Sequence, residues 1–355
     1  RGATPIKSES LQGLYNLIWK PLDSILQYSK TIYYSPSGLL HQINFDAIIV
    51  DENMNLSDRF KLVRLGSTRS LVVEDILERD TSNNSILFGG INYNLDTTLI
   101  KLDTHTHEIW VSNKEILSFT YADRELIERG NNWGYLPGTE KEIRGVSKIF
   151  QKSNFNSTTF TGNYATEESF KAIGRDIISP RVLHIATHGF FFPDSKSSFQ
   201  SVDVNVREEP VFKISDHPMI RSGLILSGGN YAWKEGKPYK EGMEDGILTA
   251  YEISQMNLSN TELVVLSACE TGLGDIQGNE GVYGLQRAFK IAGAKYLMMS
   301  LWQVPDEETK EFMITFYRNW LNEKRSIPDA FRITQKEMRE KYNDPYLWAG
   351  FVLVE

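Results

Sequence analysis

Short, mostly apolar runs recur along the chain from residue 85 onwards. Those at 182–186, 263–266 and 295–301 lack the polar alternation of a half-exposed strand, which is typical of strands buried on both faces of a sheet. Segments with apolar residues at helical spacing lie between and after these runs, at 165–173, 282–292, 306–321 and 328–341. The alternation of strand and helix predicts a parallel α/β sheet flanked by helices.

Residues 11–84 follow a different pattern. Apolar spacing over 11–28 predicts helix, with Pro21 as a kink or as the first turn of a second helix. The runs at 31–34 and 39–45 predict two strands joined by a turn. Because this region is short for a complete domain, we expect an N-terminal subdomain that shares one core with residues 85–355. Residues 1–10 are polar and irregular, which is typical of a linker.

Two polar segments interrupt the alternation. Residues 192–220 carry three prolines and no sustained period, and residues 229–244 are rich in Gly, Lys and Glu. We expect both to be surface loops, with the sheet resuming at the apolar run 223–227 between them. Long loops inside compact domains are usually functional, so we expect these two to rim a substrate groove.

The composition mainly excludes certain classes of partner. With 355 residues, 41% of them hydrophobic, the chain can bury a sizeable core. A formal charge of −8 argues against nucleic acid as a direct partner, because phosphate binding needs a concentrated basic surface. No apolar run approaches the ~20 residues of a membrane span, so we expect no membrane partner. The single cysteine cannot form an intramolecular disulfide, which fits a reducing cytoplasm.

That single cysteine, Cys269, follows the run 263–266 and precedes a glycine-rich segment. Ligands of parallel α/β sheets bind outside the carboxyl ends of the strands, so Cys269 lies where catalysis is usual. A thiol needs an imidazole to deprotonate it or to hold it as an ion pair. His188, just after the run 182–186, is the candidate, whereas His184 lies inside the run and is interpreted as a core histidine. Zinc spacing, a dinucleotide fingerprint and a Walker loop are absent, so we expect no metal and no cofactor.

Several motifs in a fixed order resemble the CHAT domain, a caspase-like cysteine peptidase module of clan CD that is related to caspases and separases. The residues that carry the resemblance are HIATHGFF at 184–191, DGILTAYEI at 245–253, LVVLSACETGLGD at 263–275, EGVYGLQRAFKIAGAKYLMMSLWQV at 280–304 and PYLWAGFVL at 345–353. The likeness continues through PLDSILQYSKTIYYSPSGLLHQINFDAI at 21–48 and LPGTEKEI at 136–143, so it covers nearly the whole chain.

The resemblance implies a three-layer α/β/α fold around a mostly parallel sheet, with residues 11–84 as a partial or degenerate subdomain. It implies that Cys269 attacks a peptide carbonyl while His188 handles the proton, as a dyad. The backbone amides of Gly189 and Cys269 are the expected donors to the oxyanion. Because CHAT domains commonly follow tetratricopeptide-like helical repeats, and because the chain begins with Arg1, we also expect such a region to precede it.

The sequence does not assign the residue that recognises the P1 side chain of the substrate. Ser267, two positions before Cys269, stands where caspases have Gln and metacaspases have Asp. A carboxylate in the groove favours Arg or Lys at P1 through a charge-assisted contact, and the candidates are Asp275, Asp245 and Glu280. The alternative for two of them is structural, with Asp245 capping a helix and Glu280 lying in the first turn of another.

Three functions follow from these observations. The first is a cysteine endopeptidase that cleaves a specific protein partner in regulated bacterial proteolysis, and the resemblance implies antiviral defence or programmed cell death with a gasdermin-like substrate. The second is a catalytically silent protein-interaction module, which the retention of Cys269 and His188 disfavours. The third is acyl transfer or hydrolysis on a small molecule, which the lack of a cofactor motif disfavours.

Overall fold

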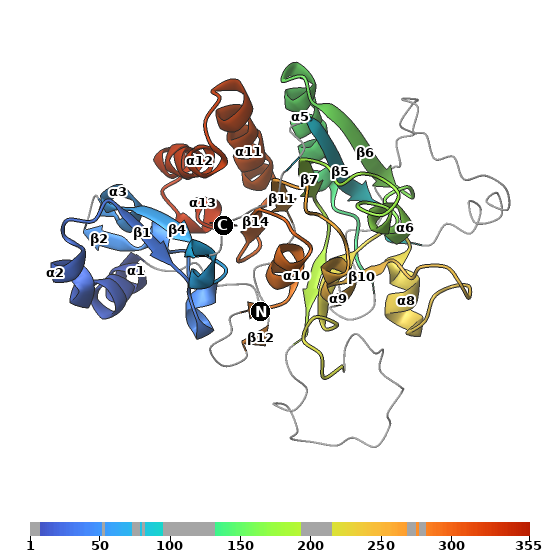
Figure 1. Ribbon diagram of the computed structural model, residues 1–355, viewed down its shortest axis with the longest axis horizontal. Coiled ribbons are helices and arrows are strands. Elements are labelled where there is room, and N and C mark those ends of the chain that lie inside the picture. The colour runs from blue at the N-terminus through green and yellow to red at the C-terminus, as the bar shows by residue number, and fades with distance from the viewer. Residues whose placement is uncertain are drawn as a thin grey trace.

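An eight-stranded sheet crosses the molecule (Figure 1). The computed structural model describes residues 8–51, 54–72, 79, 82–94, 132–192, 215–267, 275–276 and 282–355. From edge to edge the strands of the sheet are β1 (Thr31–Tyr34), β4 (Lys61–Arg64), β15 (Phe351–Val354), β14 (Tyr296–Ser300), β11 (Leu263–Leu266), β7 (Val182–Ile185), β5 (Asn84–Ile91) and β6 (Asn156–Gly162).

Strand directions confirm the mostly parallel sheet. The strands from β14 to β6 all run parallel to one another. β15 is antiparallel to β14, and β4 and β1 run parallel to β15. β7 and β11, the strands that lead towards His188 and Cys269, are direct neighbours in the interior of the sheet.

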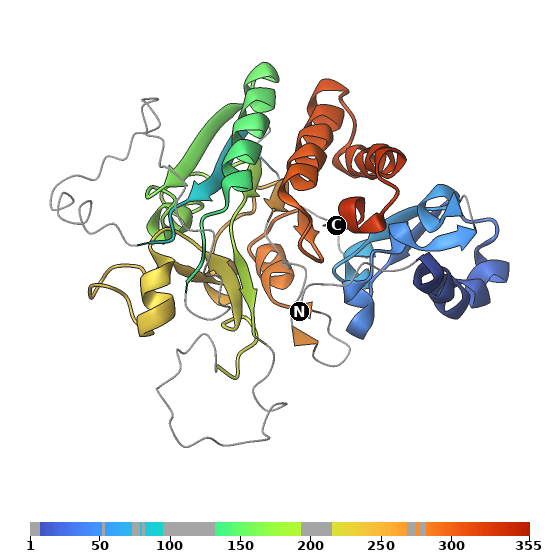
Figure 2. The same cartoon turned by 180° about the vertical axis from the view of Figure 1, so that it is seen from behind.

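Helices cover both faces of the sheet, and the side chains of β11 show why. Val264 and Leu266 belong to one buried cluster, and Leu263 and Val265 to the other, as the twofold period of a strand requires. The helices of the second cluster are α5 (Pro137–Lys152), α11 (Asp306–Tyr317) and α12 (Ile327–Lys341). Those of the first are α6 (Glu167–Lys171), α9 (Ala250–Ser254) and α10 (Leu285–Ile291). The three-layer arrangement is thus confirmed (Figures 1 and 2).

A second, three-stranded antiparallel sheet corrects one expectation. Its order is β10 (Ile247–Thr249), β9 (Ser222–Ile225) and β8 (Gly189–Phe191). The run at 223–227 therefore does not rejoin the main sheet, because an apolar run specifies burial but not the neighbour it pairs with. The segment 229–244 is also not entirely a loop, since it begins with helix α8 (Gly229–Glu235). Of the loop 192–220, residues 193–214 lie outside the described part of the chain.

The N-terminal part joins the main sheet but has a buried cluster of its own. Its helical start consists of α1 (Ser8–Leu14), a π-helical turn (Tyr15–Trp19), a 3₁₀ turn at Pro21 (Lys20–Leu22) and α2 (Asp23–Leu26). The cluster comprises Tyr15, Trp19, Phe45, Ile48, Leu56 and Phe60. The expectation of one shared core is therefore wrong for these side chains, although β1 and β4 extend the shared sheet.

Two local predictions fail for identifiable reasons. The run 39–45 forms 3₁₀ turns (Gly38–Gln42 and Phe45–Ala47) and no strand. The positive φ of Gly38 starts the first turn, and the Asn44 amide donates to the carbonyls of Ala349 and Phe351. β1 consequently pairs in parallel with β4 rather than in a hairpin.

The remaining elements are short. They are β2 (Ile49–Asp51), β3 (Met54–Asn55), α3 (Leu56–Arg59), a 3₁₀ turn (Thr68–Leu71), β12 (Asp275–Ile276), β13 (Val282–Tyr283), a π-helical turn (Arg318–Asn322) and α13 (Pro345–Trp348). Within the described residues, no helix combines the length and apolarity that crossing a membrane requires.

Candidate active site

The strands that precede the two candidate catalytic residues end side by side. β7 and β11 pair in parallel with Ile185 opposite Leu266, and the Ser267 amide donates to the Ile185 carbonyl. Both chains therefore leave the sheet at the same carboxyl edge, where parallel sheets bind ligands. Cys269 itself lies outside the described residues, so the structure follows its strand as far as Ser267.

His188 is held in a defined orientation by groups from two other segments. Its Nε2 lies 2.7 Å from the Gly134 carbonyl oxygen. Because a carbonyl only accepts, Nε2 carries the hydrogen, and the neutral ring keeps its Nδ1 lone pair. The ring packs against Tyr93 and Trp133, with centroids 4.9 Å away in both cases. Burial lowers the pKa of His188 below its ordinary value of 6.5, and the bond to Gly134 offsets part of that shift.

The Gly134 carbonyl is in turn positioned by α8. The buried Asn230 side chain accepts a hydrogen bond from the Trp133 amide at 2.6 Å and donates to the Trp133 carbonyl at 3.0 Å. These two bonds fix the peptide units on both sides of Trp133. Asn230 therefore determines where the acceptor for His188 lies.

Removal of the Asn230 amide should loosen this support. We expect Asn230→Ala to lower kcat roughly tenfold with little change in KM, because the imidazole loses its fixed position but the substrate groove does not change. The His188 pKa should also move up towards 6.5 as water reaches the ring. Both effects are read from the pH dependence of kcat. Asn260→Ala is the matched control, since that amide donates to the Ser179 carbonyl before β7; an equal loss there would contradict the assignment.

The register of the small sheet orients the Gly189 amide. The Ile225 amide donates to the His188 carbonyl, and the Phe192 amide donates to the Arg221 carbonyl. Hydrogen-bonded pairs alternate along an antiparallel ladder, so Gly189, opposite Leu224, belongs to a non-bonded pair. Its N–H consequently faces away from β9 and is free of the ladder.

A buried polar network lies beneath the same edge of the sheet, on the α5 side. Glu142 of α5 contacts His184 of β7 (Oε1 to Nε2, 2.9 Å) and Ser267 after β11 (Oε2 to Oγ, 2.9 Å). His184 Nδ1 lies 3.0 Å from the Tyr317 hydroxyl of α11. All four side chains are buried. His184 is thus a core histidine, as interpreted from the sequence, but it has polar partners on both nitrogens.

One assignment of hydrogens satisfies every member of this network. Burial and the Glu142 charge raise the pKa of Tyr317 well above its ordinary value, so its hydroxyl stays protonated and donates to His184 Nδ1. Nε2–H then donates to one Glu142 oxygen, and the Ser267 hydroxyl donates to the other. The carboxylate therefore ties together the two strands that carry the candidate catalytic residues.

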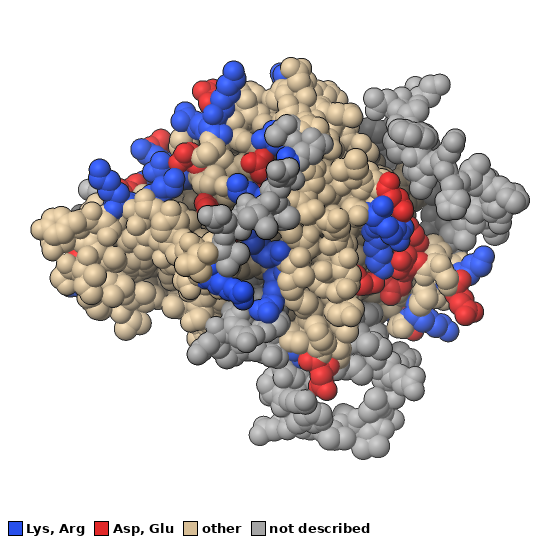
Figure 3. Space-filling view, viewed as in Figure 1, with Lys and Arg blue, Asp and Glu red and all other residues tan. Residues whose placement is uncertain are grey.

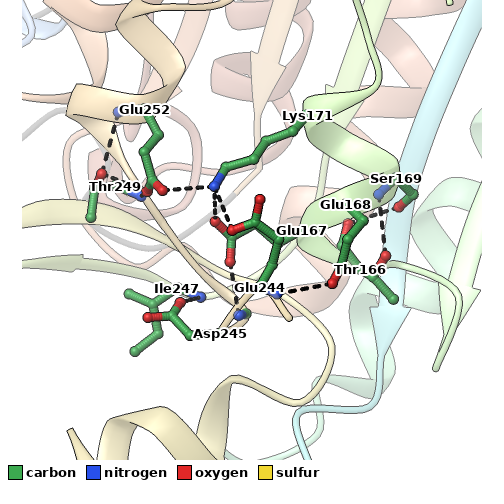
Figure 4. Close-up of polar contacts among 11 residues, drawn as sticks. Thr166, Glu167, Glu168, Ser169, Lys171, Glu244, Asp245, Ile247, Thr249 and Glu252 are labelled. Carbon is green, nitrogen blue, oxygen red and sulfur yellow. Dashed lines mark hydrogen bonds and ion pairs between the residues drawn. The ribbon is translucent and has the colours of Figure 1, made fainter. Parts of the chain in front are cut away.

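Acidic residues gather at the start of β10, around one lysine (Figure 4). The Lys171 ammonium lies 2.6 Å from Glu167, 2.7 Å from Glu252 and 2.8 Å from Glu244. Burial alone would lower the Lys171 pKa, but these carboxylates raise it above its ordinary value. Burial and the Glu252 charge raise the pKa of Glu167 to about 8. The ammonium thus supplies the positive charge that three converging carboxylates could otherwise take from a metal ion.

Asp245 lies beside this cluster and makes a different contact. Its Oδ1 accepts a hydrogen bond from the Ile247 amide at 2.8 Å, and burial raises its pKa. Thr249 caps α9 and forms a capping box with Glu252, so Asp245 is not the helix cap. β9 lies between the segments that carry Asp245 and His188. The Leu226 amide donates to the Gly246 carbonyl, and the Ile225 amide donates to the His188 carbonyl. Asp245 and His188 are thus two strands apart and offset by two residues along β9, so their backbones are about 12 Å from each other.

The other P1 candidates are placed less fully. Ser267 points its hydroxyl at Glu142 on the α5 side of the sheet. Asp275 begins β12, where its backbone pairs with Tyr283, and its side chain is not described. Glu280 lies outside the described residues.

Comparison with known families now assigns the chain. Residues 8–355 match the family model described as the CHAT domain. The chain belongs to the CHAT domain family. This confirms the resemblance seen in the sequence motifs over nearly the whole chain.

The relatives of this CHAT domain include much longer proteins. It is 25% identical over 358 residues to tetratricopeptide repeat protein 28 of Homo sapiens, and equally so to that of Mus musculus. The match covers 97% of this chain but 13% of each relative, so the chain spans a small part of their length.

Two solved structures have a similar chain path at low sequence identity. Gingipain R, an Arg-specific cysteine proteinase, aligns over 99% of this chain and 68% of its own, with 9% identity and a TM-score of 0.49. Separase in the Saccharomyces cerevisiae separase–securin complex aligns over 92% of this chain and 15% of its own, with 12% identity and a TM-score of 0.47.

Sequence reasoning on this CHAT domain missed the residues that support His188. Gly134 and Asn230 are far from it in sequence, and neither belongs to a motif with a known spacing. Glu142 gave a faint signal, because a carboxylate within the mostly apolar face of a helix is rarely buried without a partner. Its partners on β7 and β11 follow only from the sheet order.

Proposed function

We propose that this CHAT domain is a cysteine endopeptidase with Cys269 as nucleophile and His188 as general base. The observation that carries the proposal is the state of His188: Nε2 is committed to the Gly134 carbonyl, which leaves Nδ1 as a proton acceptor at the edge towards which β11 leads.

In the proposed reaction, His188 Nδ1 takes the proton of the Cys269 thiol as sulfur attacks the carbonyl carbon of a peptide bond. The oxygen of the tetrahedral intermediate accepts hydrogen bonds from the Gly189 and Cys269 amides, and the ladder register leaves the Gly189 amide available for this role. The C–N bond then breaks, and the leaving amine takes the proton from His188. Water, deprotonated by the same imidazole, releases the acyl group and restores the thiol.

We propose a basic P1 residue, recognised by Asp245. Lys171 pairs with Glu167, Glu244 and Glu252, whereas Asp245 makes no ion pair within the described residues. Its backbone lies about 12 Å from that of His188, a span that an extended Arg or Lys side chain and the Asp245 side chain cover together. A buried carboxylate with a raised pKa gains from a bidentate guanidinium partner. Asp275, Glu280 and Ser267 remain candidates for other walls of the same pocket.

Replacement of Asp245 tests this assignment directly. Asp245→Asn is expected to lower kcat/KM for substrates with Arg at P1 by about 100-fold, and that for uncharged P1 residues much less, because one charge-assisted contact is lost. Glu244→Gln, which removes one partner of Lys171, is the matched control. A uniform loss across all P1 residues would assign Asp245 to the fold instead of the pocket.

The proposed biological setting is regulated proteolysis of one protein partner in the cytoplasm. Its support is the CHAT family and the tetratricopeptide repeat named in the relatives. We propose that a helical repeat region of this type recruits the substrate or senses the signal. Bacterial antiviral defence or programmed cell death, with a gasdermin-like substrate, is the setting proposed on the CHAT resemblance.

The decisive experiment is cleavage of a proteome-derived peptide library, with the cut sites read by mass spectrometry. Cuts that share a P1 residue and disappear in Cys269→Ala support the peptidase. Cuts that persist in that variant come from a contaminant and contradict it. If the chain also yields no cut when a helical repeat region is fused before it, the chain is a protein-interaction module.

A further inference from the structure

A cavity of about 260 Å³ lies between the N-terminal part and the C-terminal helices, away from the candidate active site. Its wall is formed by Ser57 and Asp58 of α3, by one face of α12, and by Trp348 of α13. The α12 residues are Arg332, Ile333, Gln335, Lys336 and Arg339. Figure 3 shows Lys and Arg side chains, with a few carboxylates among them, over this side of the molecule.

Helical spacing concentrates the positive charge. Arg332, Lys336 and Arg339 stand at positions i, i+4 and i+7 of α12, so they share one face. The wall therefore carries three cations against the single carboxylate of Asp58, a balance of +2. This contrasts with the formal charge of −8 of the whole chain.

Existing ion pairs use only part of this charge. Arg339 forms a bidentate pair with Asp58, at 2.8 and 2.6 Å. Arg332 stands 3.7 Å from Asp329 on the preceding turn, a loose contact that Asp329 shares with Lys61 at 3.6 Å. No ion pair within 4 Å joins Lys336 to another residue that the structure describes. Arg332 and Lys336 are thus one turn apart and able to bind an anion between them.

Trp348 closes one side of the cavity and is 2% exposed. Trp348 and Ile333 also give the wall apolar surface suited to the organic part of a ligand.

We propose that this cavity binds a small molecule carrying a phosphate monoester. The dianion matches the +2 balance of the wall, and its tetrahedral oxygens can accept from an arginine and a lysine one helical turn apart. The volume of about 260 Å³ suits a free small molecule better than a phosphorylated segment of a protein. The bound ligand would join α3 to α12 and α13, beside β15 of the main sheet.

Isothermal titration of the intact chain with phenyl phosphate tests the proposal. We expect saturable binding with a Kd of roughly 0.1–1 mM at low salt, as a ligand of this size allows. Benzenesulfonate, a monoanion of similar shape, should bind about tenfold more weakly. Affinity for phenyl phosphate should rise with pH through the second phosphate pKa near 6, because the dianion is the bound form.

Variants separate this site from general surface charge. Arg332→Gln and Lys336→Gln should each weaken binding about tenfold, whereas Lys336→Arg should retain it. Arg325→Gln, an exposed arginine before α12, should have no effect.

Three results would overturn the proposal. One is the absence of saturable binding up to about 10 mM, well beyond the affinity expected for such a ligand. Another is unchanged affinity in the Arg332→Gln, Lys336→Gln double variant, provided that its thermal unfolding matches that of the unmodified chain. The third is tighter binding of a phosphoserine peptide than of phenyl phosphate, since it would assign the cavity to a phosphorylated protein segment.

Discussion

Cys269→Ala is expected to lower kcat/KM for peptide cleavage by about 10⁴-fold or more, and His188→Ala to lower it nearly as far. The first removes the atom that forms the covalent bond, and the second removes the base that creates the thiolate. Neither change should alter substrate binding, so KM should stay within a few-fold. The measurement is steady-state cleavage of the best peptide found in the library.

The double variant provides a sharper test than either single change. Residues that act as one unit give strongly non-additive losses, so the double variant should be no slower than Cys269→Ala alone. His217→Ala is the control, because this histidine is exposed and packs edge-on against Tyr251. If the losses multiply, His188 contributes through stability or substrate binding, and the dyad is wrong.

The pH profile follows from the state of His188. The imidazole must be neutral to accept the thiol proton, so kcat/KM should rise with pH through its pKa in the free enzyme. Because burial lowers that pKa, the acidic limb should lie below pH 6.5, and activity should be fully developed at pH 7. A fall in kcat/KM as the pH rises through the His188 pKa would indicate instead that the imidazole works as an imidazolium paired with the thiolate.

Much of the fold could be predicted because burial on both faces of a sheet leaves a clear pattern. β7, β11 and β14 match their predicted runs, and β11 does lie between the other two. The predictions fail where the hydrophobic pattern does not specify which strand or segment a run pairs with. The run 223–227 is apolar in either sheet, and the run 39–45 becomes 3₁₀ because Asn44 bonds to carbonyls some 300 residues further along the chain.

The candidate site also contains residues that the sequence pattern predicts and residues that it does not. His188 was visible because a histidine followed by glycine closes a buried strand. The groups that set its tautomer do not follow from the sequence, because the Gly134 carbonyl contacts the His188 ring from a distant segment, and the Asn230 side chain acts through the backbone of Trp133.

Loss of the Glu142 carboxylate is expected to destabilise the fold strongly. Glu142→Leu leaves the His184 Nε2–H and the Ser267 hydroxyl buried without acceptors. Removing one partner from a buried charged network typically costs about 3–5 kcal/mol. The measurement is the free energy of unfolding from urea titration, with unfolding followed by intrinsic fluorescence.

Glu142→Gln should be far milder, because His184 can change tautomer. With Nδ1 protonated, the ring donates to the Tyr317 oxygen, and Nε2 accepts from the new amide NH₂. The amide oxygen still accepts from Ser267, and among these contacts only the Tyr317 hydroxyl hydrogen loses its acceptor, so the cost should be about 1 kcal/mol. An ¹⁵N spectrum of the histidine rings would show the tautomer change at His184 in this variant.

Comparison of the two variants then separates stability from catalysis. Ser267 is two residues before Cys269, so a network that positions the nucleophile should lower kcat in Glu142→Gln even where stability is nearly retained. If Glu142→Leu and Glu142→Gln destabilise equally, the carboxylate charge matters rather than the closed set of hydrogen bonds. If neither destabilises, the buried network does not hold β7 and β11 together.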